Sequence, residues 1–406
     1  MRGRRTIAGN AAALVAGTVA GSVVALGISA ALGRAVRPPT VLTPQNVVEH
    51  ALEDAATPPR SRGRDARLLL AWASGSLPAR AEAAVEKVPG VRSATTVETG
   101  TDWLREVSPD ATARGRPSSS AIPLEVAVIE PREYAPFVPP AERNALLGLG
   151  AGDALIARSA GALSVAAADG EIQLVDRSLR AHSTIGDVAA NGYEALLAGE
   201  APSSWARTDR FLLIYLRDAA RRSAVEQRIR TLLRPGQALR VRAKGETPFL
   251  RYGDAVLPQL LVKKTFGEFP VVVKPDGWVE VDPTWKHANI RSARVPILGQ
   301  ITCHRTVIPQ LRDAMLEIDS EGLGHLLDRG QYGGCFGPRF IGLEPGGRLS
   351  HHTWGIAIDL NVADNAFGTK SDQDPRLVSI MESHGFTWGG RWLVPDGMHF
   401  EWVRFP

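Results

Sequence analysis

The stretch that most constrains this chain is residues 11–32, which contain no charged side chain and follow Arg2, Arg4 and Arg5. A helix needs about 20 apolar residues to cross a bilayer, and arginines collect on the cytoplasmic side of such a helix. We therefore predict that residues 1–36 form a cytoplasmic basic tip and an uncleaved single-pass anchor in the cell membrane, with all later residues extracytoplasmic. A cleaved signal peptide and a soluble alanine-rich helix are the alternatives.

The net charge and the cysteine content bear on which partners the chain binds and on the compartment in which it folds. The 406 residues include 47 Lys and Arg against 43 Asp and Glu, a net charge of +4. This near balance does not indicate a nucleic-acid partner. The only two cysteines are Cys303 and Cys335. One pair in an oxidising compartment predicts a disulfide, with two buried thiols as the alternative.

The middle of the chain repeats one order of elements. After a proline- and arginine-rich linker at 37–65, an apolar run, a helix-forming segment and an alternating segment predict strand, helix and strand. These segments are 67–74, 78–87 and 91–98, and the same order recurs at 211–216, 219–233 and 238–242. Strand-like segments lie between the two units, at 153–160, 162–167 and 171–175. We predict a split βαβ, ferredoxin-like domain with a β-rich insertion over residues 66–250.

One segment of this region carries a resemblance. The pattern LPxRxxxxVxxVPGV, starting at Leu77, together with the paired units, resembles the extracytoplasmic core domain of macrolide-exporter-type ABC transporter permeases. The resemblance implies an accessory module that binds or positions an envelope protein partner and is not itself an enzyme.

The C-terminal region, 251–406, predicts a second domain of α+β class. Apolar residues at helical spacing predict a helix over 308–318, and Asp374 followed by Pro375 predicts the start of another. Residues 356–361 and 398–403 read as short strands. Short helices interleaved with short strands favour an α+β domain with a small antiparallel sheet.

Two clusters of histidine and aspartate in this region predict a metal site. If 356–361 is a strand, Gly355, Ala357 and Asp359 share a face, and the small residues leave room in front of the sheet. His352 precedes this strand, and His399 leads into the other one. Two imidazoles and one carboxylate form a three-ligand set for Zn²⁺ with a fourth position open, as in catalytic sites. Asp396 is the candidate general base, because an attacking water needs a proton acceptor.

The same residues carry a specific resemblance. Three motifs, SxHxxGxAxD at 350–359, GFxWGGxW at 385–392 and DxMHFE at 396–401, resemble the VanY-like zinc D-alanyl-D-alanine carboxypeptidases. The resemblance implies zinc on His352, Asp359 and His399, with Asp396 as base. It also implies an arginine ahead of the first ligand that stabilises the oxyanion, for which we choose Arg339.

Neighbouring residues have weaker assignments. Glu401 is expected to orient a ligand or to form a surface ion pair, and Ser350 belongs to the first motif. Trp388 and Trp392 are expected either to wall the substrate cleft or to be core aromatics. His351 is expected beside the site and not as a ligand, because adjacent side chains diverge.

The predicted function is a membrane-anchored zinc metallopeptidase, an extracytoplasmic hydrolase that cuts peptidoglycan stem peptides in the cell wall, most simply at the terminal D-Ala. Many relatives carry Glu where this chain has Asp396, and Asp occurs in an endopeptidase branch, so an L-Ala-D-Glu-type endopeptidase is an alternative. A zinc-containing envelope binding module without turnover is another.

Overall fold

The structure is a computed structural model that describes residues 64–406, apart from 76, 106–119, 164–169, 234–237, 245, 247–248 and 255–256. All of these residues belong to one compact unit. The predicted anchor, and the predicted linker up to residue 63, lie outside the described residues. Among the helices that the structure describes, none has the length and apolar character needed to cross a bilayer.

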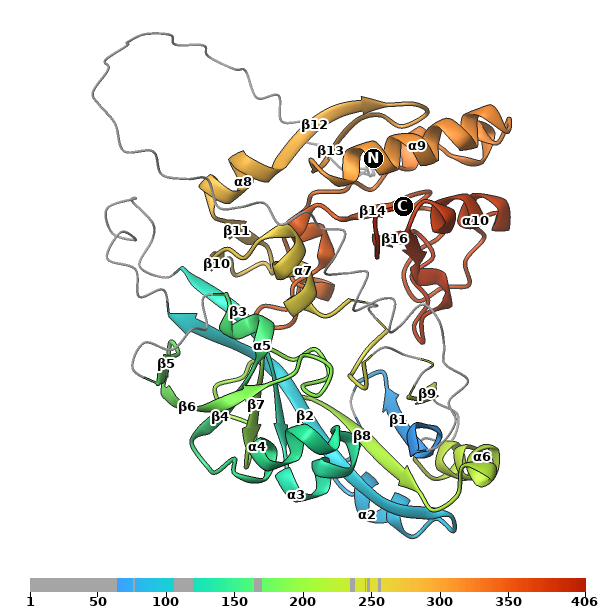
Figure 1. The fold of residues 1–406 in the computed structure, drawn as a ribbon. Helices are drawn as coiled ribbons and strands as arrows, with labels where there is room; N and C mark the ends of the chain where they lie inside the picture. The colour runs from blue at the N-terminus through green and yellow to red at the C-terminus, as the bar shows by residue number, and fades with distance from the viewer. Residues whose placement is uncertain are drawn as a thin grey trace, which may run out of the picture. The chain divides into compact units, whose positions relative to one another are not determined.

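Two β-α-β units form one end of a large sheet. The first consists of β1 (Leu68–Ala73), α2 (Ala81–Glu86) and β2 (Val91–Arg105), and the second of β8 (Asp209–Leu216), α6 (Arg222–Leu233) and β9 (Leu239–Ala243). Their strands run antiparallel in the order β2-β8-β1-β9 (Figure 1). Val225, Ile229 and Leu233 of α6 recur at four-residue spacing and pack with β1 and β8 in one apolar cluster. The two predicted units thus interleave as a split βαβ arrangement.

The chain between β2 and β8 extends the same sheet beyond β2. Its strands continue in the order β5-β6-β4-β7-β3, and the pairs β3–β7 and β4–β6 are parallel, so the sheet is mixed. The strands are β3 (Ala121–Ile129), β4 (Asp153–Ala157), β5 (Glu171–Gln173), β6 (Ser178–Ile185) and β7 (Ala195–Ala198). Three short helices accompany them: α3 (Pro131–Tyr134), α4 (Arg143–Leu147) and α5 (Arg158–Gly161).

Two sequence predictions in this insertion are wrong in part. The strand predicted over 153–160 ends at Ala157, because α5 begins at Arg158. The strand predicted over 162–167 begins in a turn, since the N–H groups of Ala162 and Leu163 donate to carbonyls three residues earlier. The rest of that strand, from residue 164, lies outside the described residues.

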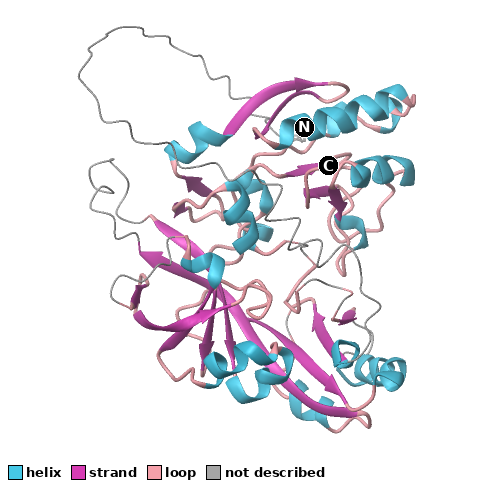
Figure 2. Cartoon of the chain, viewed as in Figure 1, coloured by secondary structure: helices cyan, strands magenta, loops and turns pink. Residues whose placement is uncertain are grey.

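The C-terminal part consists of short elements separated by loops (Figure 2). Its helices are α7 (Gln259–Phe266), α8 (Pro283–Asn289), α9 (Val307–Ser320) and α10 (Pro375–Ser383). Its strands are β10 (Val271–Val273), β11 (Val279–Val281), β12 (Ile290–Val295), β13 (Gly299–His304), β14 (Ala357–Asp359), β15 (Phe386–Trp388) and β16 (His399–Trp402). The last three form the small antiparallel sheet, in the order β14-β16-β15.

The predicted elements of this part are present with shifted ends. The helix predicted at 308–318 is α9, and Asp374 caps α10 by accepting a hydrogen bond from the N–H of Arg376. The strands β14 and β16 are shorter than the predicted 356–361 and 398–403. Gly355 is not in the strand and does not alternate with Ala357, because its φ of 67° ends a 3₁₀ helix there.

Contacts join the C-terminal part to the large sheet across the predicted division at residues 250 and 251. β10 pairs with β3 through Val271 and Ala121. In α7, the Lys263 ammonium lies 2.6 Å from Glu194 Oε1 and donates to the Pro123 carbonyl, also at 2.6 Å. Lys263 and Glu194 are both fully buried. This contact fixes α7, which begins one turn before the ion pair, against the insertion.

Candidate metal centre and active site

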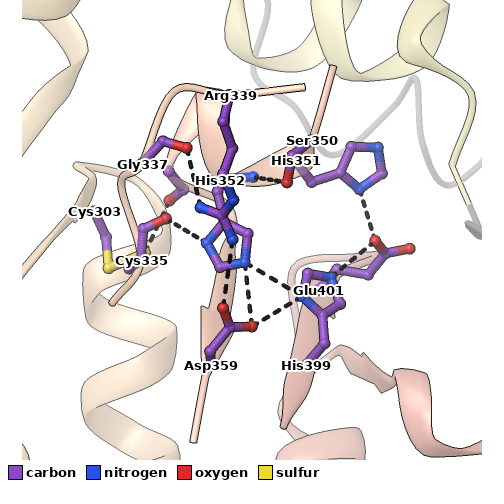
Figure 3. A network of polar contacts seen from close by, with 11 residues as sticks. Cys303, Cys335, Gly337, Arg339, Ser350, His351, His352, Asp359, His399 and Glu401 are labelled. Atoms are coloured by element: carbon purple, nitrogen blue, oxygen red, sulfur yellow. Dashed lines mark hydrogen bonds and ion pairs between the residues drawn. A yellow bond between two sulfur atoms is a disulfide. The ribbon is translucent and has the colours of Figure 1, made fainter. Parts of the chain in front are cut away.

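Three side chains converge at the edge of the small sheet. Asp359 in β14 lies opposite His399 in β16 in the antiparallel register. His352 lies in the 3₁₀ helix His351–Trp354, from which the left-handed Gly355 turns the chain into β14. His352 Nε2, His399 Nδ1 and Asp359 Oδ1 form a triangle with sides of 3.1 to 3.3 Å (Figure 3). All three residues are buried.

The outer nitrogens of both imidazoles are held by acceptors. His352 Nδ1 is 2.9 Å from the backbone oxygen of Cys335, and His399 Nε2 is 3.4 Å from Glu401 Oε2. Such bonds fix the tautomer and leave the opposite nitrogen free to bind a metal ion. Glu401 also pairs with His351 Nδ1 at 2.8 Å, so His351 contacts the site through Glu401, lines the cavity and is not in the triangle.

The charges in the cluster suit a cation. Burial acts to raise the pKa of Asp359, but hydrogen bonds from His352 and His399 outweigh it and leave the pKa well below its usual range. Burial acts to lower the pKa of His399, but hydrogen bonds to Asp359 and Glu401 raise it to about 10. Burial lowers the pKa of His352. Because a metal ion competes with a proton for the same imidazole nitrogen, metal binding here would release a proton.

The donor set fits zinc. Two imidazoles and one carboxylate, with ligand atoms all within 4.8 Å of one another, can close on one ion. A cavity of about 570 Å³ opens in front of the cluster, and Asp359, His399 and Asp396 are among its lining residues. Three protein ligands facing a cavity leave a position for water or substrate, which distinguishes a catalytic metal site from a structural one.

Asp396 lies three residues before His399 and belongs to the same cavity. Its Oδ1 is buried and, among the described residues, has no hydrogen-bond partner. Burial is the largest influence and raises the pKa of Asp396 to about 6, against the opposing effect of His399. A carboxyl group with a pKa near neutrality is suited to general acid–base catalysis.

Arg339 lies on the other side of the cluster. Its Nη2 is 3.6 Å from Asp359 Oδ2, and its Nη1 donates to the Gly337 carbonyl at 3.2 Å (Figure 3). The guanidinium is partly exposed and lines the cavity. It is thus in a position to donate to an oxygen of a ligand bound there.

The remaining predicted residues divide between the cavity and the core. Ser350 lines the cavity, and its Oγ accepts a hydrogen bond from the N–H of His352 at 3.3 Å. Trp392 also lines it, with its ring 5.3 Å from that of His399. Trp388 is not among the lining residues: its Nε1 donates to the Gly397 carbonyl, which corresponds to the core alternative.

The two cysteines form a disulfide. Cys303, at the end of β13, is bonded to Cys335, whose backbone oxygen contacts His352. The predicted disulfide is confirmed, and one of its two residues contacts a candidate ligand through its backbone oxygen (Figure 3).

Sequence reasoning missed several cavity residues. Trp72, Tyr252 and Arg348 line the cavity, and two of them precede the predicted metal motifs by about a hundred residues or more. Only Arg348 is close to a motif, and nothing in its local sequence marks it.

The site brings three potential metal ligands, the carboxyl group of Asp396 and the guanidinium of Arg339 together around one cavity, an arrangement that a metal-dependent hydrolase could use. A comparison with protein families gives a closer assignment: residues 344–402 match the family model described as D-alanyl-D-alanine carboxypeptidase. Residues 344–402 are therefore similar to the VanY-like peptidases, which supports a hydrolase. The matched segment contains His352, Asp359, His399 and Asp396, and Arg339 precedes it. No curated protein matches the chain, and the likeness of residues 66–250 to transporter permeases stays a prediction.

Proposed function

We propose that this protein is a zinc carboxypeptidase that removes the terminal D-Ala from peptidoglycan stem peptides. The observation that carries the proposal is the buried triangle of His352, Asp359 and His399, which shares its cavity with Asp396 and lies within a segment that matches the carboxypeptidase family. Among the residues that the structure describes, Asp396 Oδ1 has no hydrogen-bond partner.

The residues of the site have separate roles in this proposal. His352, Asp359 and His399 hold the zinc ion, which supplies Lewis acidity toward water and a peptide carbonyl. Asp396 accepts the proton of the attacking water and passes it to the leaving amine. Arg339 donates to the carbonyl oxygen as it gains negative charge, a contribution worth about 3 kcal/mol when one such donor is removed.

The proposal also places the enzyme at the outer face of the membrane. Residues 11–32 would anchor it, and the Cys303–Cys335 disulfide supports an oxidising compartment, since such bonds are rare in the cytosol. In the order of the chain, the segment that forms the large sheet follows the anchor and precedes the peptidase, and this segment would bind an envelope partner.

Mass spectrometry of digested muropeptides tests the reaction. The zinc-loaded, purified full-length chain is expected to shorten pentapeptide stems by one residue at the terminal D-Ala. The Asp396→Asn and His352→Ala variants are the inactive controls. Cleavage within the stem would identify an endopeptidase, and zinc binding without any cleavage would identify a binding module.

A further inference from the structure

The cavity wall beside the metal site is a short two-stranded ribbon. Phe340 and Leu349 form an antiparallel bridge, the Ser350 N–H donates to the Arg339 carbonyl, and the Ile341 N–H donates to the Arg348 carbonyl. Side chains alternate in such a ribbon. Phe340 and Leu349 belong to the hydrophobic core, so Arg339, Arg348 and Ser350 share the opposite face. These three residues line the cavity, and Leu349 also borders it.

Arg348 differs from the other arginines around this cavity. Arg339 lies near Asp359, Arg251 is paired with Glu125, and Arg207 is paired with Asp209. Within the described part of the chain, Arg348 forms no direct ion pair, although its charge acts with that of Arg251 to lower the pKa of Glu125 against the effect of burial. Its contacts are the Tyr252 ring, 5.5 Å from its guanidinium carbon, and the Tyr252 carbonyl at 3.5 Å. A cationic group on the wall of a cavity whose hydrogen-bonding nitrogens are not taken up by a carboxylate is available to an anionic ligand.

The position of Arg348 is set by residues outside the peptidase motifs. Gly253 has a φ of +94°, and a Cβ there would lie 3.0 Å from Arg348 Nη1, so glycine makes room for the guanidinium. Tyr252, under the guanidinium, is itself held by β1: its hydroxyl donates to the Ala73 carbonyl at 3.3 Å, and its ring lies 5.0 Å from that of Trp72. The large sheet therefore supports the cavity wall through Tyr252.

We propose that Arg348 binds a carboxylate of the peptide substrate and that Tyr252 is the residue that positions it. This proposal rests on the proposed peptidase function. Ser350 lies opposite Arg339 in the ribbon. Arg348 is two residues from Ser350 on the same face of the strand, which places their backbones about 7 Å apart. Consecutive residues of a peptide are about 3.8 Å apart. With Arg339 at the scissile carbonyl, a carboxylate one or two residues away falls within reach of the Arg348 guanidinium.

Such a carboxylate has two sources, the free C-terminus of the peptide or an acidic side chain upstream of the scissile bond. Four synthetic peptides ending in D-Ala-D-Ala separate them. Two end in a free acid and two in an amide, and each form carries either a neutral or a carboxylate side chain upstream.

Calorimetric binding to the zinc-loaded Asp396→Asn chain tests the proposal without turnover. Adding Arg348→Gln is expected to weaken binding of the carboxylate-bearing peptides by about 10- to 100-fold, the range for a hydrogen bond to a charged group. Binding of the neutral amide peptide should not change. Arg348→Lys should restore part of the affinity, since it keeps the charge without the bidentate fork. Arg376→Gln is the matched control, because Arg376 pairs with Asp374 on the exposed surface and does not line the cavity.

Tyr252 is tested in the same assay. Tyr252→Leu, which removes the ring under the guanidinium, is expected to weaken the same carboxylate peptides by about 3- to 10-fold, within the range of a cation–π contact. Tyr252→Phe keeps the ring and should bind nearly as well as the parent. In the chain with Asp396 intact, Arg348→Gln should raise KM and leave kcat nearly unchanged.

Different outcomes separate this proposal from the proposed function. The role of Arg348 is overturned if the parent, Arg348→Gln and Arg348→Lys chains bind each of the four peptides with equal affinity. It is also overturned if the parent binds all four peptides equally, whether or not they carry a carboxylate at the C-terminus or upstream. If peptide binding depends on Arg348 but the chain that retains Asp396 releases no D-Ala, the proposed reaction is overturned and the proposed carboxylate site is supported.

Discussion

Lys263 provides a sharp test of how the two parts of the chain are joined. Its side chain is 1% exposed, and its ammonium lies 2.6 Å from Glu194 and 3.2 Å from Glu268. Lys263→Met keeps a side chain of similar length, so the change is mainly electrostatic. It leaves the fully buried Glu194 without its counter-ion, although Glu194 still accepts from the Glu125 N–H and from Gln259 Nε2.

We expect the Lys263→Met variant to lose about 3 kcal/mol of unfolding free energy at pH 7.5, the lower end of the range for breaking one partner out of a buried ion pair. The loss should depend on pH. Burial already raises the pKa of Glu194 above its ordinary value, and removing Lys263 raises it further. When a carboxyl group has a higher pKa in the folded state than in the unfolded state, its contribution to the unfolding free energy is fully present below the unfolded-state pKa. That contribution is lost as the pH rises through the folded-state pKa. The variant should therefore be closer to the parent at pH 5 than at pH 8.

Urea unfolding followed by tryptophan fluorescence, with zinc held constant, measures this loss. Lys264→Met is the matched control, because Lys264 is the next residue and is exposed. Its effect should stay within about 0.5 kcal/mol. Adding Glu194→Gln to Lys263→Met should recover stability at pH 8, since it removes the stranded charge. Equal midpoints for the two lysine variants, or a loss that is the same at pH 5 and pH 8, would refute the reasoning.

Three further predictions concern the site. Asp396→Asn should lower kcat by about 10²- to 10⁴-fold with zinc content unchanged. In the parent, kcat/KM should rise as the pH increases through about 6, where the raised pKa of Asp396 lies. A value of kcat/KM that falls over this pH range contradicts a base role for Asp396. Glu401→Gln should weaken zinc binding by about 10- to 100-fold in a chelator competition, because it weakens the contact at His399 Nε2; unchanged affinity would reduce Glu401 to a structural partner of His351. Replacing Cys303 and Cys335 by Ser should cost about 3 to 4 kcal/mol in urea unfolding, as expected for a bond across 32 residues, and a loss below about 1 kcal/mol would count against that estimate.

The sequence predicted the parts of the site that are local in the chain. The spacing from His352 to Asp359 and from Asp396 to His399 sits within short segments, and strand pairing of β14 with β16 brings the two segments together. The predicted alternation of Gly355 with Ala357 was wrong, because a glycine can equally continue a strand or adopt the left-handed conformation that ends a helix. Its φ depends on the 3₁₀ helix before it, which no periodicity marks.

Contacts between distant segments were out of reach of a single sequence. The apolar run of β1, the helix-forming segments and the alternation in β2 predicted the split βαβ arrangement. The pairing of β10 with β3 joins residues 150 positions apart, Val271 with Ala121, and the support of Arg348 by Tyr252 depends on a partner in β1. Such pairs depend on which surfaces meet after the local elements have formed, and the two side chains carry no shared local signal.

The Cys335 carbonyl has a consequence beyond stability. One residue both takes part in the covalent cross-link to Cys303 and orients the imidazole of His352. Reduction of that bond and loading of zinc are then coupled equilibria, and coupling between two equilibria is reciprocal. If reduction of the disulfide weakens zinc binding, bound zinc must make the disulfide harder to reduce by the same factor. The zinc-loaded chain should then have a lower thiol–disulfide reduction potential than the metal-free chain.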